Sequence, residues 1–409
     1  MKLLNISNMP LWLWGKEKGI PDVWFPQKAF IEAGWDIHFL CPVKEGVSQY
    51  SFNNGIHIHT FDFPFNLRGN AYLQTNTFWR KIRASLLSNL HWFFFQIFSA
   101  FLGIRLGLKV RPDIIYAHTP ASIFSAFLAS RIVSAKLVLR FYGVRQLYWQ
   151  WDNLWLRLKE IRDYATFLIP ADAFIITDDG THGDRVARRL GVIPEKISFW
   201  RIGIDEKMFE VEPDAKEAVC RKLNIPLSSK IILSTARLNH EYGVDILVEV
   251  LPQLLEEKEE LVCVIAGGGP KENSLKAFVK KHSLSSRVFF MGIVDRGMIK
   301  RLLDAADIFV LLSRYHNCTN TLWEAMVCGR CIVTAENEAV KEVLTSGRNA
   351  VLFSPEQIQE VPAILKSLSE DEVLRKRLGE AARQRAREVL EPWTARTKKE
   401  IELLKRLVS

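Results

Sequence analysis

A chain of 409 residues is long enough for two domains, each with its own hydrophobic core. Hydrophobic residues at 48% and charged residues at 25% are typical of an ordinary soluble globular protein. The formal net charge of +9 favours anionic partners, such as nucleotide phosphates or acidic lipid headgroups. The sequence contains no RNA- or DNA-binding motif, so no nucleic-acid partner is expected.

The first 41 residues predict a strand, a helix and a second strand, at residues 3–7, 22–33 and 35–41. The loop that joins the first strand to the helix contains Gly15-Lys16-Glu17-Lys18-Gly19. Such a loop can approach a phosphate, although it is not a G-x-G-x-x-G motif. Because the strand pattern begins at once, no signal peptide is predicted.

Residues 86–108 form the most apolar run of the chain, with basic residues on both sides. A transmembrane helix is rejected, because polar and charged side chains interrupt the run and a strand pattern resumes at Asp113. Two interpretations stay open. The segment 80–111 either lies on an anionic membrane surface, with its basic flanks near the headgroups, or it covers the sheet as part of the core.

A buried strand is predicted over residues 113–118, and His118 lies at its carboxyl end, where open α/β sheets bind ligands. An amphipathic helix is predicted over residues 149–168. Residues 206–229 are charged and poorly periodic, which predicts a linker. Four more strand patterns follow, each ending at a glycine or a polar loop, as an alternating β-α domain predicts. They cover residues 231–238, 262–266, 288–291 and 306–312.

Residues 312–334 contain the most informative pattern. Thr319 or Asn320 can cap a short helix, Gly329 fits the left-handed position just past its end, and a β-branched run then predicts a buried strand. The N–H groups and positive dipole at the start of this helix suit a diphosphate. Glu324 lies about one turn in, on the side that a ribose could reach. Local physics alone favours an ordinary loop-helix-strand unit.

Two patterns could bind a metal ion. Cys328-Gly329-Arg330-Cys331 follows His316 and Cys318, which makes a zinc site conceivable, but both cysteines stand where the helix-strand pattern requires small apolar residues. Asp178-Asp179-Gly180 could suggest a carboxylate pair, and a turn explains it equally well. All six cysteines are predicted to be reduced core thiols of a cytoplasmic protein.

The stretch Asn320-Thr321-Leu322-Trp323-Glu324-Ala325-Met326-Val327-Cys328-Gly329, with the strand after it, resembles the signature of retaining GT-B glycosyltransferases. These are family 4-like enzymes, also described as glycosyl transferases group 1. Their signature contains E-x7-E, and Glu324 matches the second glutamate. His316 stands in place of the first glutamate, and Cys331 replaces a proline.

Other segments resemble the same family. The first loop, here with Gly19, faces the donor in the family, and His118 matches a strand that ends in A-H. Tyr142 stands where a neighbouring strand of the family carries a histidine. Gly203 and Asp205 match the turn where the chain passes into the second domain.

In the second half, Arg237 matches the arginine of the family's G-R-L segment. That arginine and a following lysine neutralise the leaving diphosphate, but Tyr242 stands at the lysine position. The family places the nucleotide base near the backbone of Gly292 and Ile293. The resemblance implies donor contacts from Gly19, Gly267, Gly268, Ile293, His316 and Tyr242, and from the N–H groups of Asn320, Thr321 and Leu322.

The resemblance implies a GT-B fold, in which two Rossmann-like doubly wound domains face each other across a cleft. Residues 1–203, with a returning helix at 391–409, would hold the acceptor, and residues 204–390 the nucleotide diphospho-sugar. The expected reaction transfers the sugar, with retention, to a lipid-linked or polysaccharide acceptor. His118, Arg237 and Glu324 would be the catalytic residues, without metal or cofactor. The expected location is the cytoplasm, with the inner face of the membrane as the place of any attachment.

Two other functions stay open. The departures at His316 and Tyr242 are what a catalytically decayed sugar-nucleotide-binding protein would show. The other alternative is a GT-B sugar-nucleotide epimerase. Arg314 and the lysines of the first loop could compensate for the missing lysine. The retained Arg237, Glu324 and His118 favour the enzyme.

Overall fold

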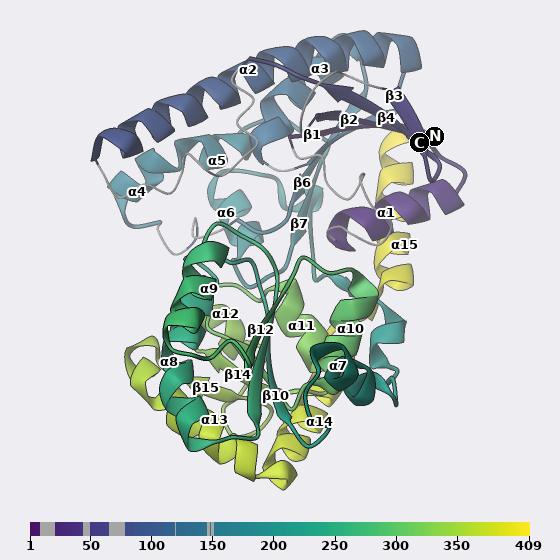
Figure 1. Cartoon of the computed structure of the whole chain (residues 1–409). Coiled ribbons are helices and arrows are strands. Elements are labelled where there is room, and N and C mark those ends of the chain that lie inside the picture. The colour runs from purple at the N-terminus through teal and green to yellow at the C-terminus, as the bar shows by residue number, and fades with distance from the viewer. Residues whose placement is uncertain (9–20, 44–49, 65–77, 119, 145–147, 149–150) are drawn as a thin grey trace. The chain divides into compact units, whose positions relative to one another are not determined.

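The computed structural model describes residues 1–8, 21–43, 50–64, 78–118, 120–144, 148 and 151–409 (Figure 1). Gly19 and most of the predicted first loop lie outside the described residues. The chain divides into two compact units. Unit 1 comprises Met1–Gly203 and Trp393–Ser409, and unit 2 comprises Ile204–Pro392. Two short strands that pair with each other, β9 (Gly203–Ile204) and β16 (Glu391–Pro392), mark the two points where the chain passes between the units.

Unit 1 is built on an eight-stranded sheet with the order β3-β4-β2-β1-β5-β6-β7-β8. β3 runs antiparallel to β4, and all other neighbours in this sheet are parallel. The strands are β1 (Lys2–Ser7), β2 (Asp36–Pro42), β3 (Tyr50–Asn53), β4 (Ile56–Phe61), β5 (Ile114–His118), β6 (Lys136–Phe141), β7 (Ala173–Thr177) and β8 (Ile197–Trp200).

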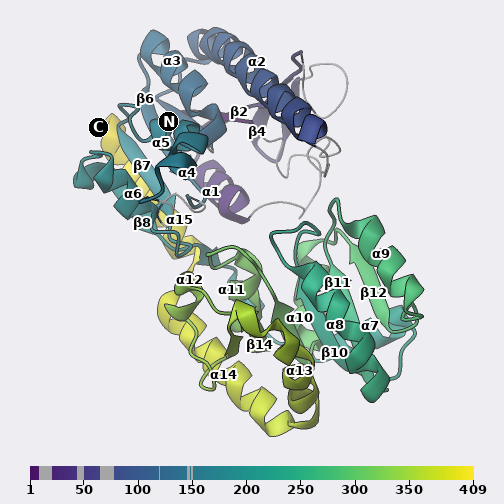
Figure 2. The same ribbon diagram turned by 90° about the vertical axis from the view of Figure 1, so that its left-hand side faces the viewer.

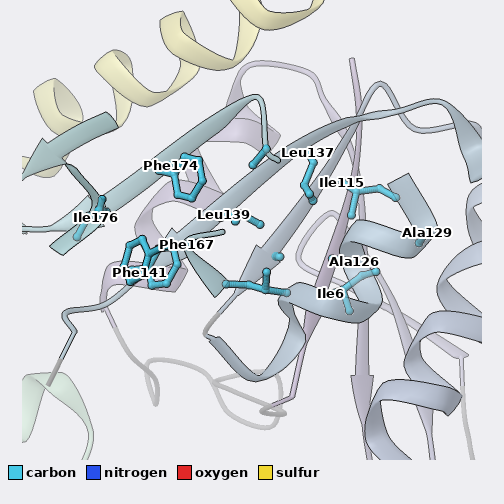
Figure 3. Packing of buried hydrophobic residues seen from close by; sticks show 14 of the residues in the cluster. Ile6, Ile115, Ala126, Ala129, Leu137, Leu139, Phe141, Phe167, Phe174 and Ile176 are labelled. Atoms are coloured by element: carbon cyan, nitrogen blue, oxygen red, sulfur yellow. The ribbon is translucent and has the colours of Figure 1, made fainter. Parts of the chain in front are cut away.

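Helices cover both faces of this sheet, because its strands are apolar on both sides. Leu137, Leu139 and Phe141 of β6 belong to one core cluster (Figure 3), whereas Val138 belongs to a second cluster on the opposite face. The second cluster also contains Leu404 of the C-terminal helix. The helices are α1 (Pro21–Glu32), α2 (Phe78–Val110), α3 (Ile123–Val133), α4 (Leu154–Lys159), α5 (Ile161–Thr166), α6 (Gly183–Arg189) and α15 (Trp393–Val408), with short 3-10 helices at Pro120–Ser122 and Pro194–Lys196.

Unit 2 is built on a six-stranded, fully parallel sheet with the order β12-β11-β10-β13-β14-β15. Figure 2 labels β10, β11, β12 and β14 of this sheet. Its strands are β10 (Lys230–Thr235), β11 (Leu261–Ala266), β12 (Val288–Gly292), β13 (Ile308–Leu311), β14 (Cys331–Ala335) and β15 (Val351–Phe353). Its helices are α7 (Ala215–Leu223), α8 (Val244–Glu257), α9 (Glu272–Lys281), α10 (Arg296–Ala305), α11 (Asn320–Val327), α12 (Glu338–Lys341), α13 (Val361–Glu370) and α14 (Glu372–Val389), with 3-10 helices at Glu206–Phe209 and Pro355–Glu360.

Two predicted segments differ from the structure. The linker predicted over residues 206–229 is wrong, because α7 lies within it and packs against α10. Ala215, Val219 and Cys220 form a short buried stripe that the surrounding charges hide in the sequence. Residues 149 and 150 of the helix predicted over 149–168 lie outside the described residues. The rest of this segment contains two short helices instead of one: α4 ends at Lys159, and α5 begins at Ile161.

α2 has one face in the core and one apolar face that is exposed. By length and composition, its segment Leu86–Val110 could cross a membrane. The buried face carries Phe95, Ser99, Gly103 and Gly107 at four-residue spacing. A Cβ atom at Gly107 would lie 2.8 Å from Val133 Cγ1 of α3, so the two helices pack closely. The exposed α2 stripe consists of Leu86, Phe93, Ile97, Phe101 and Leu108. The core interpretation therefore holds for one face only.

The structure shows the surroundings of both patterns that could bind a metal ion. All six cysteines belong to the described residues, are buried and form no disulfide with one another, and burial raises the pKa of Cys328 and of Cys331 to about 12. Asp179 Oδ1 accepts a hydrogen bond from the Thr181 N–H at 3.1 Å, and Gly180 has φ +81°. These features form a turn after β7, as one of the two interpretations predicts.

Candidate functional site

The sheet of unit 2 reverses its strand order between β10 and β13. Ligands of open α/β sheets bind outside the carboxyl ends of the strands at such a point. The loop after β10 carries Arg237 and Tyr242, and the loop after β13 carries His316 and leads into α11. The predicted donor residues of these two loops therefore lie at the same edge of one sheet.

Thr319 caps α11, and it is one of the two residues that the sequence predicts as the cap. Its Oγ1 accepts a hydrogen bond from the Leu322 N–H at 3.4 Å and lies 3.0 Å from Thr321 Oγ1. The Leu322 N–H also donates to the Thr319 carbonyl at 3.0 Å, and the Leu322 side chain is fully buried. Leu322 thus already uses its N–H within the cap. Asn320 and Thr321, which are both partly exposed, are the better candidates for phosphate contacts.

Glu324 lies one turn into α11, and its side chain is only 10% exposed. Its Oε1 is 3.4 Å from NH1 of Arg296, the first residue of α10. Asp295 caps α10 by accepting from the Met298 N–H at 2.7 Å, which fixes the start of the helix that carries Arg296. The motif around Glu324 does not point to Arg296, because their contact depends on how α10 packs beside α11.

Arg237 follows β10, and its side chain is exposed at the carboxyl edge of the sheet. The backbone beside it touches the glycine loop after β11. Gly267 has φ +144°, and a Cβ atom there would lie 1.9 Å from the Ala236 carbonyl oxygen, so only glycine fits. A Cβ atom at Gly268 would lie 2.9 Å from the Ile293 side chain, which is 76% exposed. Gly267, Gly268 and Ile293 are therefore brought together next to Arg237.

Tyr242 and Tyr315 join the loops after β10 and β13. Their rings meet edge to face with centroids 5.9 Å apart. The Tyr242 N–H donates to Asn239 Oδ1 at 3.3 Å. His316, the next residue after Tyr315, is exposed. His316 and Tyr242, the two departures from the family that fall among the expected donor contacts, thus lie on the same pair of loops.

Asp245, at the start of α8, forms ion pairs with basic side chains at the carboxyl edge of the unit 2 sheet. Its carboxylate accepts from Arg314 NH1 at 2.9 Å and from Lys271 Nζ at 2.7 Å. Burial alone would raise the pKa of Asp245, but the hydrogen bonds from Arg314 and Lys271 hold it below its usual value. Arg314 also donates to the His240 carbonyl at 2.5 Å. The sequence interpretation missed Asp245, whose carboxylate neutralises the arginine proposed to compensate for Tyr242.

In unit 1, His118 ends β5 and is 1% exposed. Its Nε2 lies 2.7 Å from Asn5 Oδ1, and its Nδ1 lies 2.6 Å from the Tyr142 hydroxyl. Asn5 Nδ2 donates to the His38 carbonyl at 3.2 Å, and Asn5 also forms a reciprocal amide pair with Gln27. Asn5 Oδ1 is therefore an acceptor, so His118 carries its proton on Nε2 and accepts from Tyr142 on Nδ1.

His118 is a neutral, internally bonded imidazole. Burial, with a smaller effect from Arg140, lowers the pKa of His118 to about 3. Burial also raises the pKa of the Tyr142 hydroxyl, which stays protonated as a donor. His118 pairs with Ser7 where the strand order of unit 1 reverses between β1 and β5, the predicted ligand-binding edge. Direct contact with a substrate would require one of its two ring hydrogen bonds to break.

Behind this pair lies a buried charged network that holds the C-terminal helix. Arg140 is 1% exposed, stands 4.6 Å over the Tyr142 ring and donates to Thr177 Oγ1 at 2.9 Å. Glu400 of α15 accepts from the Tyr116 hydroxyl and, at 3.0 Å, from Arg396. Polar residues such as Arg140 within an apolar strand pattern are the one sequence signal that could have indicated this network.

Two family descriptions match consecutive parts of the chain. Residues 27–207 match Glycosyltransferase Family 4, and residues 215–385 match Glycosyl transferases group 1. The α-D-kanosaminyltransferase of Streptomyces kanamyceticus is 24% identical over 288 residues, which are 68% of this chain and 74% of that relative. The sulfoquinovosyl transferase SQD2 of Arabidopsis thaliana is 22% identical over 71% of this chain and 56% of its own length.

Solved structures share the fold along the whole chain. Anabaena Alr3699/HepE in complex with UDP and glucose matches with a TM-score of 0.71 and 18% identity, over 99% of each chain. WaaG, a glycosyltransferase involved in lipopolysaccharide biosynthesis, matches with a TM-score of 0.67 and 15% identity, also over 99% of each chain. With both family descriptions matched and a doubly wound sheet in each unit, this chain belongs to the GT-B glycosyltransferases of the family 4-like type.

Proposed function

We propose that this glycosyltransferase takes its sugar from a nucleotide diphospho-sugar of the UDP-sugar class and passes it, with retention, to a lipid-linked or polysaccharide acceptor. One observation carries the donor part. Glu324 stands one turn into α11, at the carboxyl edge of the sheet that also presents the exposed Arg237. The fold relative HepE, which was solved with UDP and with UDP-glucose, supports the choice of nucleotide.

Glu324 would accept hydrogen bonds from the ribose hydroxyls, since an ionised carboxylate is an acceptor only. Arg296 holds this carboxylate from the α10 side at 3.4 Å. The ribose would therefore meet a preoriented acceptor, and the entropy of ordering the side chain would already be lost before binding.

Arg237 and the start of α11 would stabilise the negative charge that develops on the departing diphosphate. Preorganised donors and cations act most strongly where charge develops in the transition state. Arg314 would contribute little, because Asp245 already neutralises its guanidinium. Tyr242 adds a hydroxyl but no charge. We propose that this reaction needs no metal ion, so the activity should survive chelation.

The α2 stripe supports an acceptor that is presented at a membrane. Phe93, Phe101 and Leu108 are each more than half exposed on the side of α2 that faces away from the core. Arg105 and Lys109 are exposed on the last turns of the helix. An apolar helix face with basic neighbours binds the interface of an anionic bilayer. The proposed location is the cytoplasm, at the inner face of the membrane.

The proposal is tested with a panel of nucleotide diphospho-sugars and the wild-type chain, by calorimetry and by donor hydrolysis or transfer. We expect binding to one UDP-sugar and turnover with a glycan or lipid-linked acceptor. The same panel is run with the His316→Glu/Tyr242→Lys double variant, which restores both family residues. A wild type that neither binds nor turns over any donor, beside a double variant that does, would establish the catalytically decayed alternative.

A further inference from the structure

One face of the outer part of the unit 1 sheet carries a cluster of three histidines and one aspartate. Asp36 and His38 are two residues apart on β2, and His57 and His59 are two residues apart on β4, so the side chains of each pair point to the same face. The parallel register places His38 directly beside His57. The four polar groups therefore share one face of two neighbouring strands.

Three atoms of this cluster have the spacing of metal ligands. His38 Nε2 lies 3.3 Å from Asp36 Oδ1, and His57 Nε2 lies 3.5 Å from the same oxygen. The three ligand atoms all lie within 4.8 Å of one another. Tetrahedral ligands bonded to zinc at about 2.0–2.1 Å are about 3.3–3.4 Å apart. We propose that Asp36, His38 and His57 bind a divalent first-row transition-metal ion of the Zn²⁺ class.

The second ring nitrogen of each of the two proposed histidine ligands lies within hydrogen-bond distance of a further residue. His38 Nδ1 lies 3.0 Å from His59 Nε2, and His57 Nδ1 lies 2.6 Å from the Tyr50 hydroxyl. Metal-binding histidines generally have their other ring nitrogen hydrogen-bonded in this way, which fixes the tautomer and the ring orientation. This arrangement is independent of the distances to Asp36 and points to the same ligand set.

The proposed site is open enough for an ion and a water molecule to enter. The side chain of His38 is 12% exposed, that of His57 33% and that of Asp36 40%. Two imidazoles and one carboxylate are a donor set suited to Zn²⁺, and a water molecule would complete four-coordination. The Asp36 carboxylate would neutralise one of the two positive charges of the ion, as the single carboxylate ligand does in hydrolytic zinc sites with two histidines.

The location indicates a structural role. Asp36 begins β2, and His57 is the second residue of β4, so the cluster lies at the amino ends of these parallel strands. His118 lies at the carboxyl end of β5, at the opposite edge of the same sheet. The ion would tie β4 to β2, next to β3, which is the edge strand of the sheet. The site is thus separate from the proposed transfer reaction.

Metal binding makes a specific prediction for the two histidine tautomers. A nitrogen that binds a metal cannot carry a proton, so the bound state requires the proton on Nδ1 of His38 and of His57. Without metal, Nε2–H groups facing Asp36 Oδ1 satisfy the carboxylate, and Tyr50 donates to His57 Nδ1 instead. Nitrogen NMR of the full chain would therefore show both tautomers change on addition of Zn²⁺ if the site exists.

The closing experiment uses the full chain without an affinity tag, after dialysis against EDTA. Titration with ZnCl₂ is followed by calorimetry, by thermal unfolding and by the tautomer signals. We expect one ion per chain and a higher unfolding temperature, since the ion binds the folded state. Co²⁺ should give the visible absorption of a tetrahedral site.

Variants separate this site from other metal ligands. Asp36→Asn and His57→Gln should lower Zn²⁺ affinity at least tenfold, and His59→Gln, which removes an outer contact, by about 10–100-fold. His282→Gln, at the exposed end of α9 in unit 2, is the matched control and should change nothing. A cooperative thermal unfolding transition in the presence of EDTA would show that each variant is folded without metal. Absent saturable binding, unchanged wild-type tautomers, or binding that survives Asp36→Asn and His57→Gln would each overturn the proposal.

Discussion

Glu324 and Arg296 form a partly buried ion pair between α11 and α10, with Oε1 3.4 Å from NH1. A strong charge-assisted bond between such groups is shorter, at about 2.7–2.9 Å. Arg296 thus orients the carboxylate without closing on it. In the proposed complex the ribose hydroxyls would add the shorter hydrogen bonds.

We expect Glu324→Ala to weaken nucleotide binding without unfolding the protein. Removing the acceptor of a charge-assisted hydrogen bond should cost about 1.5–3 kcal/mol. Calorimetry with UDP measures the loss. Glu380→Ala, an exposed glutamate on α14, is the matched control. Unchanged UDP affinity of Glu324→Ala would contradict the ribose role.

We expect Arg296→Gln to weaken UDP binding less than Glu324→Ala does, because it acts only by orienting the carboxylate. In the double variant the loss should be no larger than in Glu324→Ala alone, since groups that act through one contact are not additive. A double-mutant cycle by calorimetry checks this. Additive losses would assign Arg296 a separate contact with the donor.

Arg237→Ala should lower kcat more than it lowers donor affinity. Its exposed charge would act mainly as the diphosphate leaves, and only stabilisation that is stronger in the transition state raises the rate. Steady-state kinetics and calorimetry separate the two effects. Arg221→Ala, at an exposed arginine of α7, serves as the control. An intact kcat with a raised Kd would assign Arg237 to ground-state binding.

His118 should make folding stability depend on pH. Its pKa is lowered from 6.5 to about 3 in the folded state, chiefly by burial. The unfolded chain then binds a proton that the folded chain does not. The stability that depends on neutral His118 is therefore fully present above pH 6.5. As the pH falls toward 3, the free energy of unfolding decreases by at most about 1.4 kcal/mol per pH unit.

Chemical denaturation of the wild type and of His118→Gln between pH 7 and pH 4 tests this effect. Glutamine does not titrate, so the difference between the two free energies of unfolding should shrink as the pH falls. Other histidines titrate in both proteins and cancel in the difference. A constant difference over this range would mean that His118 is not held neutral.

The protein should co-sediment with anionic liposomes at low salt through the α2 stripe. Phe93→Ser/Phe101→Ser should reduce binding, because it removes apolar area that would enter the interface. Val373→Ser, at a 79% exposed position of α14 in unit 2, should not. High salt should weaken binding, since it screens the basic side chains. Absence of wild-type binding at low salt would reject the membrane role.

Much of the candidate donor site could be predicted from the sequence, because its signals are local. Thr319 caps α11 and Gly329 adopts φ +65°, as residue type and spacing predict. The strand that ends at His118 was also predicted, because its apolar run is uninterrupted. Caps, left-handed glycines and buried parallel strands depend on neighbouring residues, so a single sequence contains them.

Contacts between distant residues were decided by the tertiary structure alone. Arg314 looks like an available cation in the sequence, but the packing of α8 beside the loop after β13 brings Asp245 onto it. His118 looks like a reactive group, yet the pairing of β1 with β5 encloses it between Asn5 and Tyr142. No local pattern contains either pairing.

The apolar run of α2 and the histidines of β2 and β4 show the same division. Composition determines that residues 86–108 form a long apolar helix, but close packing at Gly107 against Val133 decides which face is buried. Alternation places Asp36 with His38 on one face of a strand. Only the parallel register of β2 and β4 brings His57 beside them, because strand order and register are set by the packing of the whole sheet.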